Sequence, residues 1–235
     1  MRKITSLIIL GCFFLVSSTG FSQDESKNFA LWNSVGVKYS PIKRLHLGLE
    51  QHLRLKENAS VTDEYFTEVN LGYEILKDFE ISGGARFIRE NDNVGKKQGY
   101  ENHFRYNVDL SFKHDIKRFS LSYRFRYQNK KEQDVDDGEE NLTKENVRFK
   151  VGLDYNIKKW PLDPKLSVES YSNLEDVQQV RELGLNKYRI TFGTSYSLKK
   201  FGKFGIFYRL QESIVSNLSN EQTKILGLKY SYSIK

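Results

Sequence analysis

Apolar and polar residues alternate along most of the chain after residue 27. Residues 118–130 are typical, because every second position is apolar, in the order Phe119, Leu121, Tyr123, Phe125 and Tyr127. The residues between them are Ser, Arg or Gln. A period of two residues indicates a β-strand with one apolar and one polar face. No segment after residue 27 keeps a helical period, so the pattern predicts an all-β protein.

The alternating segments predict eleven strands, most of them 11 to 15 residues long. They lie near residues 28–39, 44–56, 62–76, 79–91, 100–114, 118–130, 144–157, 164–174, 185–198, 203–215 and 222–235. Strands of soluble proteins average about five or six residues, whereas strands that cross a membrane obliquely need about nine to eleven. The predicted lengths therefore favour a transmembrane β-barrel.

The connections between these segments alternate in length. The short ones lie near residues 40–43, 77–78, 114–117, 158–163 and 199–202, and the longer polar ones near 57–61, 91–99, 131–143, 175–184 and 216–221. Outer-membrane barrels have short periplasmic turns and longer extracellular loops in this alternation. We therefore predict a closed antiparallel transmembrane β-barrel in a bacterial outer membrane.

The sequence pattern predicts the number of strands less directly than it predicts the fold. Single-chain bacterial barrels have an even number of strands. We therefore expect twelve, with residues 23–29 forming an additional irregular strand. Ten is the alternative, if the weakly alternating region 164–184 contains fewer strands than its length suggests.

Aromatic residues on the apolar faces are placed near the strand ends. Those predicted near the short turns are Tyr39, Phe79, Phe112, Phe119, Tyr155, Tyr196 and Phe204. Those predicted near the long loops are Tyr65, Tyr100, Tyr127 and Tyr188. Amphipathic rings prefer the boundary between lipid and water. The two sets therefore predict two aromatic girdles around an aliphatic belt.

The N-terminus has the pattern of a secretory signal peptide. Arg2 and Lys3 precede an apolar run that ends at Val16, and small residues then predict cleavage after Ser22. We expect residues 1–22 to be the signal peptide and residues 23–235 to be the barrel. The single cysteine, Cys12, lies inside the signal. The mature protein is therefore expected to contain no disulfide and no thiolate metal site.

The polar faces of the predicted strands carry many charges, and these separate along the chain. The acidic wall that we predict for the lumen contains Glu50, Glu64, Glu68, Glu74 and Glu80. The basic wall contains Arg105, Arg118, Arg124, Arg126, Arg148, Lys150, Arg189 and Arg209. Two interpretations remain open. Ion pairs across the lumen could fill a narrow barrel, or the two walls could form a transverse field that orients polar solutes in water.

No residue pattern predicts catalysis, a metal site or a cofactor. The sequence lacks a Gly-x-Ser-x-Gly motif, and the hydroxyl nearest in sequence to the lumen residue His52 is Ser60, in a loop. The acidic segment 132–140 does not have the glycine spacing of a calcium-binding EF-hand loop. The formal net charge of +7 suggests nucleic acid at first. A basic lumen already explains this charge, so we expect no nucleic-acid partner.

Three segments resemble a known protein family. They are FALWNSVGVKYSPIKRLHLGLEQHLRL, FSLSYRFRYQNK and VRFKVGLDYNIKKWPLDPKLSVESY. They are similar to the domain of unknown function 2490 family, a family of bacterial outer-membrane β-barrels. The resemblance spans most of the chain after the signal and implies the same fold and location. The family has no assigned activity, so the resemblance implies no catalytic residues.

The sequence thus leads to three functional hypotheses. The first is a narrow pore or ligand-binding barrel with a charge-segregated polar lumen, whose partners are small polar solutes or ions. The second is a structural or partner-binding barrel without permeation. The third is a membrane-embedded lipid hydrolase or acyltransferase, although we expect no enzyme. The other expected partners are the outer-membrane bilayer and the barrel-assembly machinery, because the last strand, with Tyr230, Tyr232 and Ile234 on one face, resembles an assembly signal.

Overall fold

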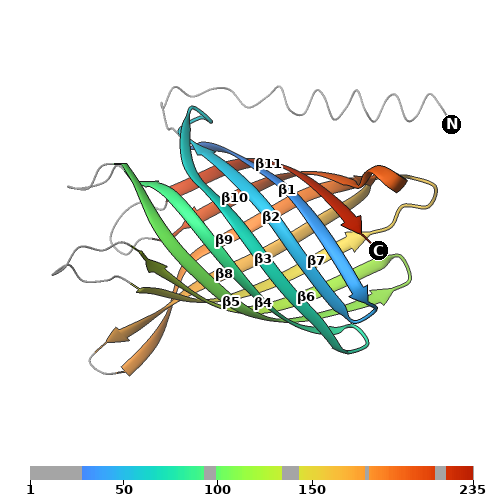
Figure 1. The fold of residues 1–235 in the computed structure, drawn as a ribbon, viewed down its shortest axis with the longest axis horizontal. Coiled ribbons are helices and arrows are strands. Elements are labelled where there is room, and N and C mark those ends of the chain that lie inside the picture. The colour runs from blue at the N-terminus through green and yellow to red at the C-terminus, as the bar shows by residue number, and fades with distance from the viewer. Residues whose placement is uncertain (1–27, 93–98, 134–142, 178–179, 215–220, 235) are drawn as a thin grey trace.

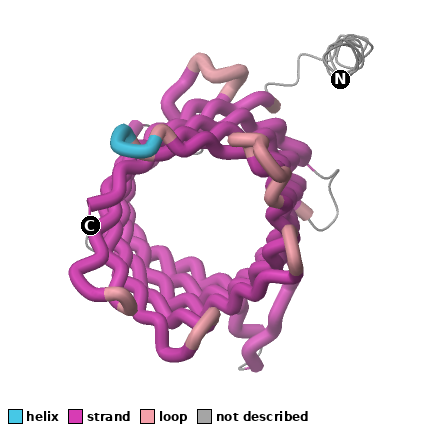
Figure 2. Tube along the Cα trace, turned by 90° about the vertical axis from the view of Figure 1, so that its right-hand side faces the viewer, coloured by secondary structure: helices cyan, strands magenta, loops and turns pink. Residues whose placement is uncertain are grey.

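The computed structural model describes residues 28–92, 99–133, 143–177, 180–214 and 221–234. These residues form eleven strands that close into one barrel (Figures 1 and 2). The strands are β1 (Phe29–Ile42), β2 (Leu45–Lys56), β3 (Val61–Leu76), β4 (Phe79–Asp92), β5 (Gly99–Ile116), β6 (Phe119–Glu132), β7 (Thr143–Tyr155), β8 (Asp163–Val177), β9 (Val180–Ser197), β10 (Lys203–Ser213) and β11 (Glu221–Ile234). One short 3₁₀ helix, η1 (Lys199–Phe201), joins β9 to β10. No helix among the described residues is long and apolar enough to span a membrane.

The barrel closes through a parallel pair of strands. Each strand is antiparallel to the strand before and after it in the sequence, but β1 and β11 run in the same direction. Their register pairs Phe29 with Lys224 at one end and Tyr39 with Ile234 at the other. The backbone carbonyl of Asn28 extends this pairing by accepting a hydrogen bond of 2.7 Å from the amide of Lys224. No strand of the barrel is therefore left with an unpaired edge.

The prediction of an all-β closed barrel is confirmed, but the predictions of twelve strands and of an entirely antiparallel sheet are wrong. Hairpin connections reverse the chain at every step. An odd number of strands therefore leaves the first and last strands pointing the same way, and only a parallel pair can close the ring. We expected residues 23–29 to form an additional strand. Residues 28 and 29 form no separate strand, because Phe29 is already the first residue of β1. Residues 23–27 lie outside the described part of the chain.

The alternative of ten strands is also wrong. Residues 164–177 and 180–184 belong to two long strands, β8 and β9, which pair from Asp163 with Ser195 to Val177 with Val180. The segment that we predicted as loop 175–184 thus extends this hairpin. A register shift between Tyr171 and Ser172 interrupts the alternation of faces in β8. This bulge explains why the sequence pattern is weakest there.

The predicted alternation of short and long connections holds from β1 to β7, but it is wrong beyond β7, where the connection from β7 to β8 spans 156–162 and that from β8 to β9 only 178–179. Short turns of two residues follow β1, β3 and β5, at 43–44, 77–78 and 117–118. The connections that follow β2, β4 and β6 lie at the opposite end, where the first of them spans 57–60. In the next two connections, residues 93–98 and 134–142 lie outside the described part of the chain. Figure 1 shows all the strands crossing the barrel obliquely between these two ends.

The outer surface of the barrel is apolar. Leu49 and Leu71, on neighbouring strands, expose 52% and 51% of their surface and are two of the many large apolar side chains exposed on this surface. Of the predicted girdle residues, seven are exposed: Tyr39, Tyr65, Tyr100, Phe112, Phe119, Tyr196 and Phe204. The other four, Phe79, Tyr127, Tyr155 and Tyr188, are half-buried on the same outward faces. Neighbouring girdle rings touch, as Phe119 and Tyr155 do with ring centroids 4.7 Å apart.

Candidate functional site

A cavity of about 1300 Å³ occupies the inside of the barrel, and side chains from all eleven strands line it. Its lining extends from Ser40 and His46, near the short-turn end, to Thr143 and Lys144, at the long-loop end. Period-two alternation produces this lining, because the residues between the exposed apolar ones face inward. The cavity is therefore the place where the polar faces of all the strands meet.

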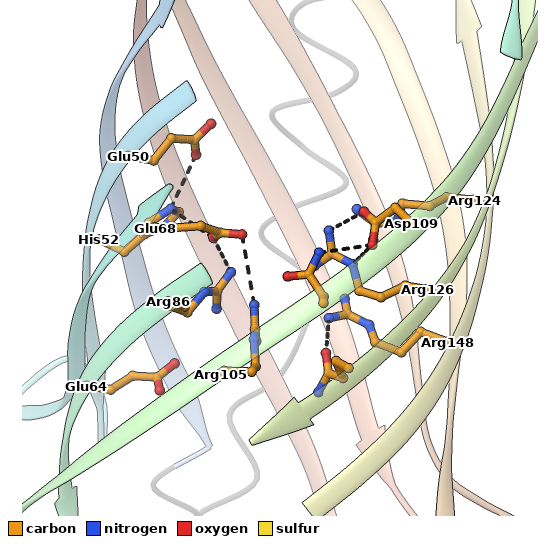
Figure 3. A network of polar contacts seen from close by, with 12 residues as sticks. Glu50, His52, Glu64, Glu68, Arg86, Arg105, Asp109, Arg124, Arg126 and Arg148 are labelled. Carbon is orange, nitrogen blue, oxygen red and sulfur yellow. Dashed lines mark hydrogen bonds and ion pairs between the residues drawn. The ribbon is translucent and has the colours of Figure 1, made fainter. Parts of the chain in front are cut away.

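The carboxylates on the acidic side of the cavity are paired with cations close to them. Glu68 on β3 is only 6% exposed and forms an ion pair with Arg86 on β4. A second guanidinium, that of Arg105, lies 4.0 Å from Glu68. Glu50 on β2 accepts hydrogen bonds of 2.8 and 3.0 Å from the Lys229 ammonium. Figure 3 shows the groups around Glu68 pointing toward one another from adjacent strands.

A second network of polar side chains lies on the neighbouring part of the barrel wall, on β5 to β7. Arg126 on β6 donates two hydrogen bonds, of 2.7 and 2.5 Å, to the two carboxylate oxygens of Asp109 on β5. The Asn107 amide donates a further bond of 3.0 Å to Asp109. Arg148 on β7 donates to Gln128 at 2.9 Å (Figure 3). Such a two-point guanidinium–carboxylate contact fixes the orientation of both groups.

The ion pairs join strands that are one or two apart along the wall. Among the described residues, no ion pair crosses the cavity from one side to the other. The interpretation of cross-lumen pairs is therefore wrong in its geometry. Local pairing is favoured because adjacent strands are only about 4.8 Å apart, well within the reach of an arginine side chain.

Most of the predicted wall residues line the cavity. Those that do are Glu50, Glu64, Glu68, Glu80, Arg105, Arg124, Arg126, Arg148, Lys150, Arg189 and Arg209. Two predicted residues do not. Arg118 is exposed in the turn between β5 and β6, where the alternation of faces has ended. Glu74 lies at the short-turn rim, where its side chain is 46% exposed.

Inward-facing aromatic residues were not predicted from the sequence. Trp32, Phe66, Tyr171 and Phe207 face the lumen, and arginines stack on each of them. The closest guanidinium carbons lie 3.7 Å from the centroid of Trp32, 3.9 Å from that of Phe66 and 4.1 Å from that of Tyr171. These cation–π contacts hold the guanidinium groups in fixed positions. The alternation could have predicted the inward direction of Phe66, because Phe66 directly follows the outward-facing Tyr65 and successive side chains of a strand point to opposite faces.

Cations dominate the wall formed by β6 to β10. We call six of them the basic cluster: Arg124, Arg148, Lys150, Lys187, Arg189 and Arg209. The register places Arg124, Lys150, Glu169 and Arg189 beside one another on four consecutive strands. Glu169, 6% exposed, accepts hydrogen bonds of 2.7 Å from both Arg124 and Arg148. Glu169 and Lys187 were missing from the predicted walls, although both alternate in phase with predicted wall residues.

The histidine of the lumen, His52, has no hydroxyl nucleophile among its recorded contacts with the described residues. His52 stacks on Phe66 with ring centroids 4.4 Å apart, and its Nε2 lies 3.3 Å from Glu50. The Ser60 hydroxyl donates to the backbone carbonyl of Glu57 at 2.5 Å, away from His52. Within the described residues there is no group of three His, Cys, Asp or Glu side chains that could hold a metal ion.

A different histidine has a hydroxyl and a carboxylate beside it. At the short-turn rim, His46 Nδ1 lies 3.0 Å from the Ser40 hydroxyl, and Nε2 lies 3.4 Å from the Glu74 carboxylate. These are the residue types of a Ser–His–Glu triad. However, the side chains of His46 and Glu74 are 39% and 46% exposed, so the imidazole is well solvated.

The comparisons with known proteins identify a family and nothing more specific. Residues 29–221 match the family described as "Protein of unknown function (DUF2490)". This range covers the barrel from the start of β1 to the first residue of β11. No curated protein and no solved structure matches the chain.

Replacing Glu169 tests whether the basic cluster needs its carboxylate. Glu169→Gln keeps the shape of the side chain but leaves Arg124 and Arg148 without their anion. Breaking a buried ion pair costs about 3–5 kcal/mol. We expect a large decrease in the urea midpoint of unfolding, measured in chloride buffer.

The matched control is Asp154→Asn. Asp154 pairs with Lys165 at 2.6 Å, but both side chains are 38% exposed. An exposed pair contributes only about 0–1 kcal/mol. Equal midpoints for the two variants would show that solvent compensates the basic cluster without Glu169.

Proposed function

Because the chain belongs to the DUF2490 family, whose function is unknown, we propose a function from the barrel itself: a narrow outer-membrane pore or ligand-binding barrel for small polar solutes. The observation that carries the proposal is the 1300 Å³ polar cavity, whose lining reaches both ends of the barrel. Eight-stranded barrels are just filled by side chains, whereas barrels of sixteen strands hold a clear channel. Eleven strands favour a passage for small solutes only.

The outer-membrane location is part of this proposal. The apolar residues exposed around the barrel are the strongest support, because water would disfavour such a surface and lipid would not. The closed ring also pairs the edges of all the strands, as hydrocarbon requires. We propose that residues 1–22 direct export and that the barrel-assembly machinery inserts the mature chain. The short turns would then face the periplasm, and the long connections would be extracellular.

A pair of arginine substitutions tests the lipid-facing surface. Leu49 faces outward and is 52% exposed, and its neighbour Gly48 lines the cavity. A Cβ atom at Gly48 would meet only Asn70, at 3.6 Å or more, so a side chain there has room. Arginine on the lipid face costs about 2–4 kcal/mol at the bilayer midplane.

We expect Leu49→Arg to reduce the fraction of protein that folds into lipid vesicles, and Gly48→Arg to reduce it much less. The measurement is the shift in electrophoretic mobility between folded and heat-denatured protein. Equal folding of the two variants would contradict the membrane placement.

Permeation is tested at the same two positions. Purified protein should produce discrete conductance steps in a planar lipid bilayer. We expect Gly48→Trp to lower the single-channel conductance, because the indole enters the lumen, and Leu49→Trp to leave it unchanged. Absence of steps in the wild-type protein would favour the alternative, a structural or partner-binding barrel without permeation.

A second candidate function, ester hydrolysis, rests on the arrangement of Ser40, His46 and Glu74 at the rim. A general base needs a hydrogen bond to the hydroxyl, and this one is 3.0 Å long. In the well-known triads, the serine bonds Nε2 and the carboxylate bonds Nδ1, whereas here the two nitrogens are exchanged. The exchange and the solvation of His46 make hydrolysis the weaker assignment.

The Ser40→Ala variant separates the two assignments. We expect the wild-type protein and Ser40→Ala to hydrolyse p-nitrophenyl acetate equally slowly. A rate that depends on Ser40, and that titrates with an imidazole, would make the barrel a hydrolase. Gly48→Ala, which also changes the lining of the cavity, serves as the control.

A further inference from the structure

The charges that line the cavity do not balance. Among the described lining residues, fourteen are Lys or Arg and seven are Asp or Glu. The acidic side contributes little field, because Glu50, Glu64 and Glu68 each have a cation in contact. The excess positive charge therefore lies mainly on the opposite wall. Of the predicted acidic wall, Glu50, Glu64 and Glu68 are thus compensated and Glu80 has no ion pair with the described residues, whereas the predicted basic wall stays largely uncompensated.

The basic cluster contains most of this excess. Glu169 is the one acidic side chain in contact with it among the described residues. Its oxygens are already engaged, by Arg124 and Arg148 at 2.7 Å and by the Tyr171 hydroxyl at 3.0 Å. Glu169 thus contacts two of the six cations, but its single negative charge neutralises only one positive charge.

The remaining cations of the cluster have neutral partners or none. Arg189 donates to the Gln211 amide oxygen at 2.7 Å and to the Tyr171 hydroxyl. Arg209 donates to the Thr191 hydroxyl at 2.8 Å. Lys150, which is half-buried, makes no hydrogen bond or ion pair with the described part of the chain. Its ammonium therefore has all three donors available to a ligand.

Two further donors of the cluster are buried without an acceptor. The Nε atoms of Arg124 and Arg148 are inaccessible to solvent and make no hydrogen bond with the described residues. Arg148 as a whole is 7% exposed. Buried charged donors are normally satisfied. The Nε atoms of Arg54, Arg86 and Arg105, outside the cluster, are unsatisfied in the same way, so what distinguishes the cluster is the positive charge that Glu169 leaves uncompensated.

We propose that the basic cluster binds a small oxyanion with two or more negative charges, of the phosphate or polycarboxylate class. Planar guanidinium groups match the paired oxygens of such anions, which a halide lacks. The stacking of Arg148 on Tyr171 and of Arg209 near Trp32 holds these groups in place before the ligand arrives. The inference rests on the proposed function, since it names the solute that the lumen receives.

Calorimetric titration of the purified full-length barrel in non-ionic detergent tests the proposal. Inorganic phosphate is one probe and citrate the other, both at constant ionic strength in chloride. We expect saturable binding of at least one of them. The double variant Lys150→Gln, Arg209→Gln should weaken it by about tenfold or more, because two charge-assisted contacts are removed.

The matched control removes the same charge from the ends of the cavity. Lys38 and Lys144 also line it, at the short-turn and long-loop ends. The variant Lys38→Gln, Lys144→Gln should change the affinity less than about twofold, because screened charges outside a site contribute little. Equal weakening in both double variants would overturn the proposal in favour of a diffuse positive potential. Binding of neither probe to the wild-type protein would also overturn it.

A single variant and a comparison of the two probes complete the test. If the double variant does not fold, Lys150→Gln alone decides the test, since this change leaves no described carboxylate without its partner. Preference for phosphate or for citrate identifies which of the two anion classes the cluster receives. The titration needs neither a membrane nor permeation. Saturable binding without conductance would therefore support the oxyanion site and overturn permeation. Conductance without saturable binding would support permeation and overturn the oxyanion site.

Discussion

Closure of the sheet is the constraint on which the rest of the structure depends. A strand edge left open would present a row of unpaired backbone N–H and C=O groups. Here the ring is completed by eleven register pairs between β1 and β11, from Phe29 with Lys224 to Tyr39 with Ile234. Because the strand number is odd, this last pair is parallel. The two termini of the barrel consequently lie at opposite ends, unlike those of an even-stranded barrel.

Closure also gathers every inward face into one enclosed space. Charges that would be independently solvated on an open sheet become neighbours, and each must find a partner or remain uncompensated. On β2 to β5 the partners lie one or two strands away, as in the pairs of Glu68 with Arg86 and of Glu50 with Lys229. On β6 to β10 the cations outnumber Glu169, so the same geometry that neutralises one wall leaves the other positive. The electrostatic character of the lumen is thus a result of closure and register together.

Aromatic residues make different contacts on the outward and inward faces of the strands. Outward rings such as Phe119 and Tyr155 touch one another at the strand ends. Inward rings such as Trp32 and Phe66 instead carry arginines on their faces. The contact of Phe207 with Gly227 shows the crowding of the lumen, because a Cβ atom at Gly227 would lie 2.0 Å from that ring. The lumen is therefore ordered by packing as well as by charge.

The sequence by itself determined the all-β fold, the strand segments, the alternation of turns as far as β7 and the face of most wall residues, because a period of two is a local property. Glu169 and the inward Phe66 were equally accessible to that reasoning and were missed. Only the tertiary structure decided the strand number, the parallel seam between β1 and β11, and which cation meets which carboxylate. It alone brought Ser40, His46 and Glu74 together. These features depend on register between strands and on closure between chain ends 195 residues apart, as with the pair of Phe29 and Lys224 at the seam. No local pattern encodes such long-range pairing.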